Sequence, residues 1–142
     1  MKVAIASDHA GFEMKEALKP FLTSLGLDIK DLGTNSKDPV DYPDYGKKVG
    51  ACVATKKAER GVLICGSGIG MCMTANRYKN VRAVNLSDIF DAEMSRKHND
   101  ANVACLGARK TSLEDAKKML QVWFETPFEG GRYEKRVEKI EQ

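Results

Sequence analysis

Cys65 follows an apolar run and opens a glycine-rich loop in the stretch VLICGSGIGM, residues 62–71. Glycines let the backbone N–H groups of residues 66–70 approach a ligand closely, and such groups at a helix N-terminus stabilise an anion. A cysteine in this position favours its thiolate form, which is a base or a nucleophile. The combination has the parts to remove a proton from carbon and to hold the oxyanion that forms.

A structural interpretation of the same residues stays open. A buried cysteine packs as a small hydrophobe, which accounts for Cys52, Cys72 and Cys105, and the glycines could form only a tight turn. Two nucleotide-binding interpretations are excluded. The loop reads GxGxG rather than GxGxxG, and it lacks the lysine and the hydroxyl of a P-loop.

Other polar side chains follow predicted strands or end predicted helices. Asp8 and His9 come directly after the first strand, although Asp8 would also suit a helix cap. His98 stands at a helix end, where a histidine often interacts with the helix dipole. Tyr42 lies near the start of a helix and suits either a hydrogen bond to a sugar hydroxyl or aromatic packing.

Two arginines stand out near the C-terminus. Arg132 and Arg136 are four residues apart in EGGRYEKRVEKIEQ, so they share one face of a helix. Two guanidinium groups that point the same way suit a phosphate, because each offers a fork of donors and a permanent charge. A solvated, salt-bridged terminal helix is the alternative.

Hydrophobic periodicity alternates between strands and helices along the chain. The strand-like runs are KVAIAS, DIKDLG, GVLICG, VRAVNLS and NVACLGA. The helical patterns cover Phe12–Leu25, Tyr45–Lys57, Gly70–Tyr78, Asp88–Lys97 and Leu113–Glu125. This order predicts an α/β fold with a mostly parallel five-stranded sheet and helices on both faces. Because ligands bind beyond the carboxyl ends of such strands, we expect the residues after each strand to form the site.

Composition narrows the class of protein. The chain has 142 residues and a formal charge of +3 from scattered basic and acidic residues, which predicts one domain over residues 1–142 and no nucleic-acid partner. No run is apolar enough for a membrane span or a signal peptide. The four cysteines lack CxxC spacing, which argues against a zinc site and a disulfide framework. We therefore expect a cytoplasmic protein with reduced thiols.

Seven ordered motifs resemble one known family. They are SDHAG, DYPDYG, ICGSGIGM, ANR, SRKHNDAN, LGAR and EGGR followed by a second arginine. They resemble the ribose-5-phosphate isomerase B family, which also includes galactose-6-phosphate isomerase subunits, and the resemblance runs essentially end to end. It implies a Rossmann-like, three-layer αβα sandwich with a C-terminal helix. It also implies interconversion of an aldose and a ketose phosphate without a metal or cofactor.

The resemblance implies a role for each motif residue. Cys65 would be the general base that removes the C2 proton of ring-opened ribose 5-phosphate, and Ser67 would help to move protons between the oxygens of a cis-enediolate. His98 would be the ring-opening acid, with Asp8 as its polar partner. The implied substrate-binding residues are His9, Tyr42, Gly66, Ser67, Gly68, Ile69, Gly70, Asn99, Arg109, Arg132 and Arg136. Of these, His9 and the three arginines would bind the phosphate.

The resemblance also implies a homodimer or a dimer of dimers, in which the equivalents of His98, Asn99 and Arg109 come from the neighbouring subunit. Tyr133 departs from the family pattern, because many relatives have histidine there. Three alternatives remain. They are an isomerase of a six-carbon phosphate such as allose 6-phosphate or galactose 6-phosphate, a non-catalytic module that binds phosphate ligands, and a thiol redox protein.

Overall fold

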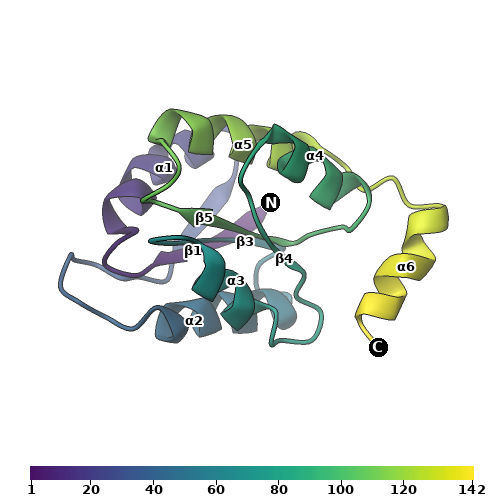
Figure 1. Cartoon of the computed structure of the whole chain (residues 1–142), viewed down its shortest axis with the longest axis horizontal. Coiled ribbons are helices and arrows are strands. Elements are labelled where there is room, and N and C mark those ends of the chain that lie inside the picture. The colour runs from purple at the N-terminus through teal and green to yellow at the C-terminus, as the bar shows by residue number, and fades with distance from the viewer.

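Five parallel strands form the central layer of the structure, a computed structural model that describes all of residues 1–142 (Figure 1). The strands are β1 (Lys2–Ser7), β2 (Asp28–Asp31), β3 (Arg60–Cys65), β4 (Ala83–Asn85) and β5 (Val103–Gly107). Their order across the sheet is β2-β1-β3-β5-β4, and every neighbouring pair is parallel. The sheet is therefore wholly parallel, where the sequence predicts a mostly parallel one.

Helices cover both faces of the sheet, so the predicted three-layer αβα sandwich is confirmed (Figure 1). One face carries α1 (Phe12–Ser24), α4 (Ile89–Lys97) and α5 (Leu113–Glu125), and the other carries α2 (Tyr42–Ala54) and α3 (Ile69–Ala75). None of the helices is long and apolar enough to cross a membrane.

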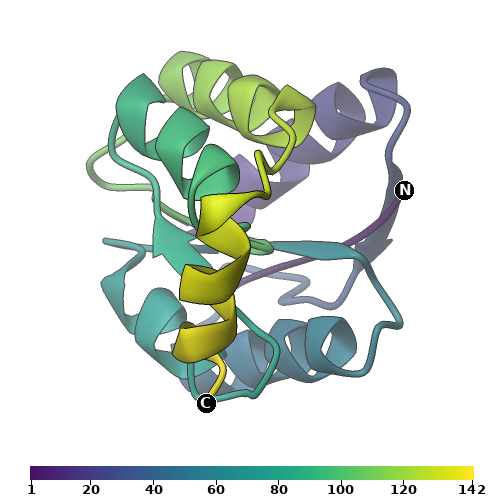
Figure 2. The same ribbon diagram turned by 90° about the vertical axis from the view of Figure 1, so that its right-hand side faces the viewer.

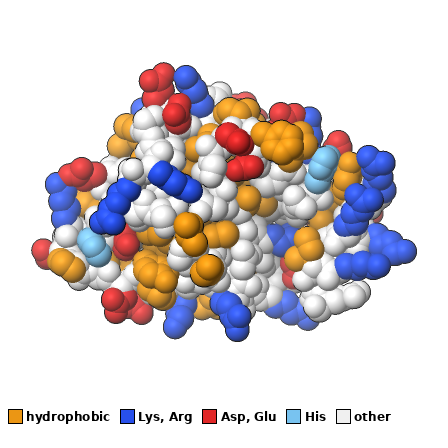
Figure 3. Space-filling view, in the orientation of Figure 1, with side chains coloured by type: hydrophobic (Ala, Val, Ile, Leu, Met, Phe, Trp, Pro, Cys, Tyr) orange, Lys and Arg blue, Asp and Glu red, His pale blue; other side chains and the backbone are white.

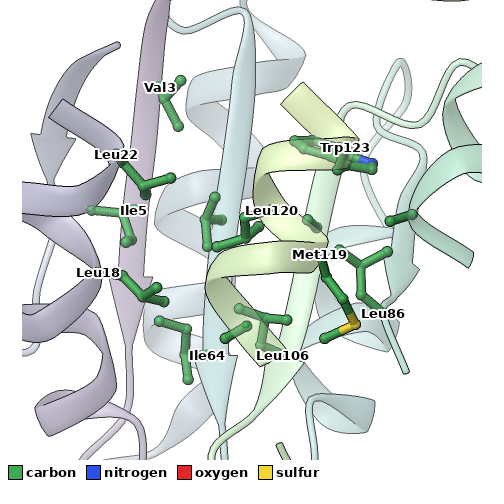
Figure 4. Close-up of a cluster of buried hydrophobic side chains, with 14 of the residues drawn as sticks. Val3, Ile5, Leu18, Leu22, Ile64, Leu86, Leu106, Met119, Leu120 and Trp123 are labelled. Atoms are coloured by element: carbon green, nitrogen blue, oxygen red, sulfur yellow. The ribbon is translucent and has the colours of Figure 1, made fainter. Parts of the chain in front are cut away.

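The central strands are apolar throughout because helices bury both of their faces. In β3, Val62 and Ile64 point to the side of α1 and α5, whereas Leu63 and Cys65 point to the side of α2 and α3. Figure 4 shows the first of these two cores, in which the fully buried Trp123 closes one end. Neither core includes the loop residues that follow the carboxyl ends of β1 and β3, where a site can form.

The last helix, α6 (Arg132–Ile140), stands apart from the sandwich, and none of its residues is buried. Figure 2 shows it crossing the edge of the molecule from the α4 side toward the α2 and α3 side. Beyond its end, a Glu141 carboxylate oxygen lies 2.8 Å from a guanidinium nitrogen of Arg82, and the other accepts the backbone N–H of Asn80 at 2.8 Å. This exposed helix is held at its ends rather than by a core of its own.

Some element boundaries differ from the predicted ones. Helix α2 begins at Tyr42, three residues earlier than the periodicity indicates, because Asp41 has extended backbone and Pro43 fits the first helical turn. It ends at Ala54 rather than Lys57, and Lys56 has a positive φ of 60° that the helix cannot contain. The sheet edges are also shorter than predicted, since β2 and β4 have only four and three residues.

A buried ion pair ties α1 to the end of β2. The ammonium of Lys15 is wholly buried and lies 2.6 Å from an Asp31 carboxylate oxygen, which Lys19 also contacts at 2.8 Å. The other Asp31 oxygen accepts the backbone N–H of Gly33 at 2.9 Å. Burial tends to raise the pKa of Asp31, but the hydrogen bonds from Lys15, Lys19 and Gly33 outweigh it and lower the pKa. The pair therefore stabilises the ionised form.

Replacing Asp31 with asparagine is expected to lower the free energy of unfolding by about 3 kcal/mol at pH 7, because Lys15 loses its closest counter-charge inside the protein. Urea unfolding of both proteins measures this difference. The folded-state pKa of Asp31 is lowered, so its contribution is complete above the unfolded pKa of about 3.9 and is lost as the pH falls through the folded value. A gap between the two proteins that stays constant down to pH 2 would contradict this assignment.

Candidate active site

A crevice opens where the chain changes direction across the sheet. From β1 the chain goes first to β2 on one side and then to β3 on the other, so the loops after β1 and β3 diverge at their carboxyl ends. A cavity of about 570 Å³ lies there. Its lining residues are Asp8, Tyr42, Cys65, Gly66, Ser67, Ile69, Gly70, Met73, Arg109 and Lys110. The predicted crevice is therefore present, with Cys65 and the glycine loop in its wall.

Cys65 ends β3 and is only 5% exposed. Its sulfur accepts the backbone N–H of Gly68 at 3.2 Å, a contact that stabilises negative charge on the sulfur. Cys105 packs in the same core, but it is fully buried and does not line the cavity. A hydrogen bond with Cys72 and burial raise the pKa of the Cys105 thiol well above its ordinary value, so this cysteine stays neutral. Only Cys65 combines a polar partner with access to the crevice.

The loop after Cys65 offers several unused donors. The backbone N–H groups of Gly66, Ser67 and Gly70 donate to no acceptor in the protein, whereas that of Ile69 donates to the Ser67 hydroxyl at 3.2 Å. The carbonyl of Ser67 accepts the Asn85 side-chain amide at 3.4 Å, which fixes the loop from the β4 side. The free amides and the Cys65 sulfur thus occupy one wall of the crevice.

Three further predicted residues lie in or beside the crevice. The Tyr42 ring lies against the backbone of Gly70, where a Cβ would meet it at 2.4 Å, and the side chain is exposed rather than packed in the core. Asp8 is 7% exposed and accepts the Gly11 N–H at 3.1 Å, so it supports the turn before α1 while it lines the cavity. His9 follows it, and its Nδ1 accepts the Val40 N–H at 3.1 Å.

Arg109 needs a correction. The family resemblance implies that this arginine comes from a neighbouring subunit, but the structure places it in the cavity of its own chain, with its guanidinium beside Gly66. The reason is strand pairing, because Cys65 lies opposite Gly107 and Arg109 follows two residues later. Lys110 and Met73 also line the cavity and were missed by the sequence analysis. The position of Lys110 directly after Arg109 was the signal for it.

The other predicted residues lie at the opposite end of the strands. Helix α4 starts beyond the carboxyl end of β4 and runs back, so His98 at its C-terminal end and the adjacent Asn99 lie near the amino ends of the strands. Arg132 and Arg136 lie on α6, whose end of the molecule carries a concentration of basic side chains in Figure 3. The histidines (pale blue) lie toward opposite ends of that view. One chain therefore carries the predicted site in two separated halves.

Comparison with known proteins identifies the family. The family described as Ribose/Galactose Isomerase matches residues 3–140 of the chain. The chain belongs to this family. Ribose-5-phosphate isomerase B of Escherichia coli strain K12 is 40% identical over 139 residues, which cover 98% of this chain and 93% of the relative. The chain is thus a sugar-phosphate isomerase, as its motifs predict.

Solved structures agree in fold over nearly the whole length. Ribose-5-phosphate isomerase B of Clostridium thermocellum superposes with a TM-score of 0.97 at 40% identity, covering 99% of this chain and 95% of the other. The enzyme of Mycoplasma genitalium, solved with bound ribulose-5-phosphate, has a TM-score of 0.94 at 35% identity and covers 99% and 93%. The chain therefore shares its fold with these ribose-5-phosphate isomerase B structures.

Replacing Gly68 with alanine is expected to lower kcat/KM of the isomerase about a hundredfold. Gly68 has a φ of 81°, and a Cβ there would lie 2.9 Å from the Leu106 backbone, so the loop must move and its N–H must leave the Cys65 sulfur. Gly26→Ala is the matched control, because Gly26 has a similar φ of 85° but open space around it. The control should lose stability without losing activity. Wild-type activity in Gly68→Ala would show that the loop amides are not needed.

Proposed function

We propose that the chain interconverts ribose 5-phosphate and ribulose 5-phosphate through ring opening and a cis-enediolate, with Cys65 as general base. One observation carries the proposal: the Cys65 sulfur lies 3.2 Å from the Gly68 nitrogen and beside the unused amides of Gly66, Ser67 and Gly70. The names of the E. coli and M. genitalium relatives support this choice of substrate.

In the central step, the thiolate of Cys65 takes the proton from C2 of the open-chain aldose and returns it to C1. Negative charge develops on the substrate oxygens between these two transfers. The free amides of the loop stabilise that charge without reorganising, which is the largest contribution that such donors make to catalysis. The Ser67 hydroxyl, exposed at the rim and already accepting the Ile69 N–H, is placed to pass the proton between O1 and O2.

Ring opening and phosphate binding need groups from both halves of the site. Asp8, His9, Tyr42 and Arg109 lie on the Cys65 side. The half at the amino ends of the strands supplies His98 as the ring-opening acid, Asn99 for a sugar hydroxyl, and Arg132 and Arg136 for the phosphate. Because one chain cannot bring its own halves together, a second copy delivers its His98 half to the Cys65 crevice, and a twofold axis then completes two sites at once.

The surface around the crevice supports this pairing. Ile69 and Met73 are 51% and 67% exposed, although apolar side chains of this size are usually buried. Ile69 and Met73 line the crevice itself. A homodimer would cover such residues while it brings the two halves together, so the active site and the subunit interface would form in one event.

Initial rates on ribose 5-phosphate and ribulose 5-phosphate, measured with purified protein in EDTA, test the proposal. We expect turnover in both directions and a higher kcat/KM for ribose 5-phosphate than for allose 6-phosphate or galactose 6-phosphate. A preference for a six-carbon phosphate would replace the proposed substrate. Binding of ribose 5-phosphate without turnover would identify a phosphate-binding module, and thiol–disulfide exchange without isomerisation would identify a redox protein.

A further inference from the structure

Tyr133 contacts the ring-opening histidine directly. Its phenol ring stacks on the His98 imidazole, with 4.2 Å between ring centroids and 16° between the ring planes. The two residues come from different helices, because Tyr133 lies in the first turn of α6 and His98 ends α4. Near them, the Glu129 N–H donates to the Lys97 carbonyl at 3.1 Å. This short contact region is where the start of α6 meets the body of the molecule.

The same tyrosine also contacts both phosphate-binding arginines of α6. The Arg132 guanidinium donates to the Tyr133 hydroxyl at 2.9 Å and its carbon lies 5.0 Å from the ring centroid. The Arg136 guanidinium carbon lies 5.5 Å from that centroid. A cation at such a distance from an aromatic ring is attracted by the ring's quadrupole. Tyr133 is therefore in contact with His98, Arg132 and Arg136, three of the four residues assigned to this half of the site.

These contacts matter because little else orients the groups. No residue of α6 is buried, so no core fixes the rotation of the helix. His98 forms no side-chain hydrogen bond within the chain, and the Arg132 and Arg136 side chains take part in no ion pair. The stacked, nearly parallel ring of Tyr133 limits the tilt of the imidazole. Because both arginines contact the same ring, their positions relative to the imidazole are limited as well.

We propose that Tyr133 is a positioning residue. It holds the ring-opening histidine and the phosphate-binding arginines at fixed positions relative to one another, so that one substrate molecule can contact both. The inference rests on the proposed function. The ring and the hydroxyl have separable tasks: the ring sets the plane of His98, and the hydroxyl holds Arg132. In this assignment Tyr133 acts through its contacts with His98, Arg132 and Arg136.

Two substitutions separate these tasks. Tyr133→Phe keeps the stacked ring and loses one hydrogen bond, so KM for ribose 5-phosphate should rise about threefold with kcat unchanged. Tyr133→Leu loses the ring, and kcat on ribose 5-phosphate should fall about tenfold because the ring-opening acid is misplaced. Lys135→Ala changes the same helix without touching this cluster and should match wild type. Thermal unfolding of all four proteins checks that they are equally folded.

A second readout separates positioning from a merely structural role. Ribulose 5-phosphate cannot close a furanose ring, so exchange of its C1 proton with D2O needs the enediolate but not ring chemistry. At saturating substrate, Tyr133→Leu should raise the ratio of C1 exchange to net ribose 5-phosphate formation about fivefold, as a slowed ring step predicts. If the wild type is active and the ratio for Tyr133→Leu is no higher than the wild-type ratio, the inference about Tyr133 is wrong while the proposed function stands. An inactive wild type would overturn the proposed function and this inference with it.

Discussion

Cys65→Ala is expected to lower kcat on ribose 5-phosphate about a thousandfold, because removal of a positioned general base typically costs two to four orders of magnitude. The substitution removes the only thiol that lines the crevice and leaves the loop amides in place. The free energy of unfolding should change by only about 1 kcal/mol, since the substitution removes only the sulfur atom at the edge of the core. Steady-state rates and urea unfolding of the same preparation measure the two effects separately.

Cys105→Ala is the matched control for this experiment. Cys105 packs in the same core as Cys65, is fully buried and does not line the crevice. Its replacement should cost at least as much stability and leave kcat near wild type. If both variants lose activity in parallel with stability, the sulfur of Cys65 acts through packing. If Cys65→Ala keeps wild-type turnover, the base is another group.

Two inactive variants are expected to restore each other when they share a dimer. A Cys65→Ala chain keeps an intact His98 half, and a His98→Asn chain keeps an intact Cys65 half. A dimer with one chain of each kind therefore holds one site with both intact halves and one site with both substitutions. Such a hybrid should show about half of the wild-type kcat per dimer, because one of two symmetric sites works.

The experiment requires isolated hybrids. Co-expression with two different affinity tags and sequential purification provides them, and each variant alone should be at least about a hundredfold below wild type on ribose 5-phosphate. Cys65→Ala combined with Gly68→Ala is the matched control, since both changes damage the same half and their hybrid has no intact site. A Cys65→Ala and His98→Asn hybrid as inactive as this control would show that sites are not shared between chains.

The local sequence pattern was enough to predict which residues lie together at the crevice. The apolar run before Cys65 identifies a doubly buried strand, and the rule that ligands bind beyond strand ends places Asp8, Cys65 and the glycine loop together. Arg109 was predicted as a site residue but assigned to the wrong chain. The pairing of β3 with β5, which no sequence pattern specifies, places it in the crevice of its own chain.

Other features depend on packing between distant segments. Tyr133 and His98 are 35 positions apart, and their stacking follows from the path of residues 126–131, which have no periodicity to interpret. The early start of α2 at Tyr42 depends on the extended backbone of Asp41 rather than on hydrophobic spacing. Sequence reasoning identifies such residues by type, whereas their contacts come from the fold.

Deuterium exchange tests the central claim, proton removal by Cys65, most directly. Ribose 5-phosphate is brought to equilibrium with ribulose 5-phosphate by the wild type in D2O over many turnovers, and proton NMR follows the C2 position of the aldose and the C1 position of the ketose. Removal of a proton by the exchangeable thiol of Cys65 predicts progressive deuteration of both positions and none with Cys65→Ala over the same time. Full equilibration of the sugars by the wild type without any deuteration would contradict it, because hydrogen would then have moved between the carbons without passing through an exchangeable base.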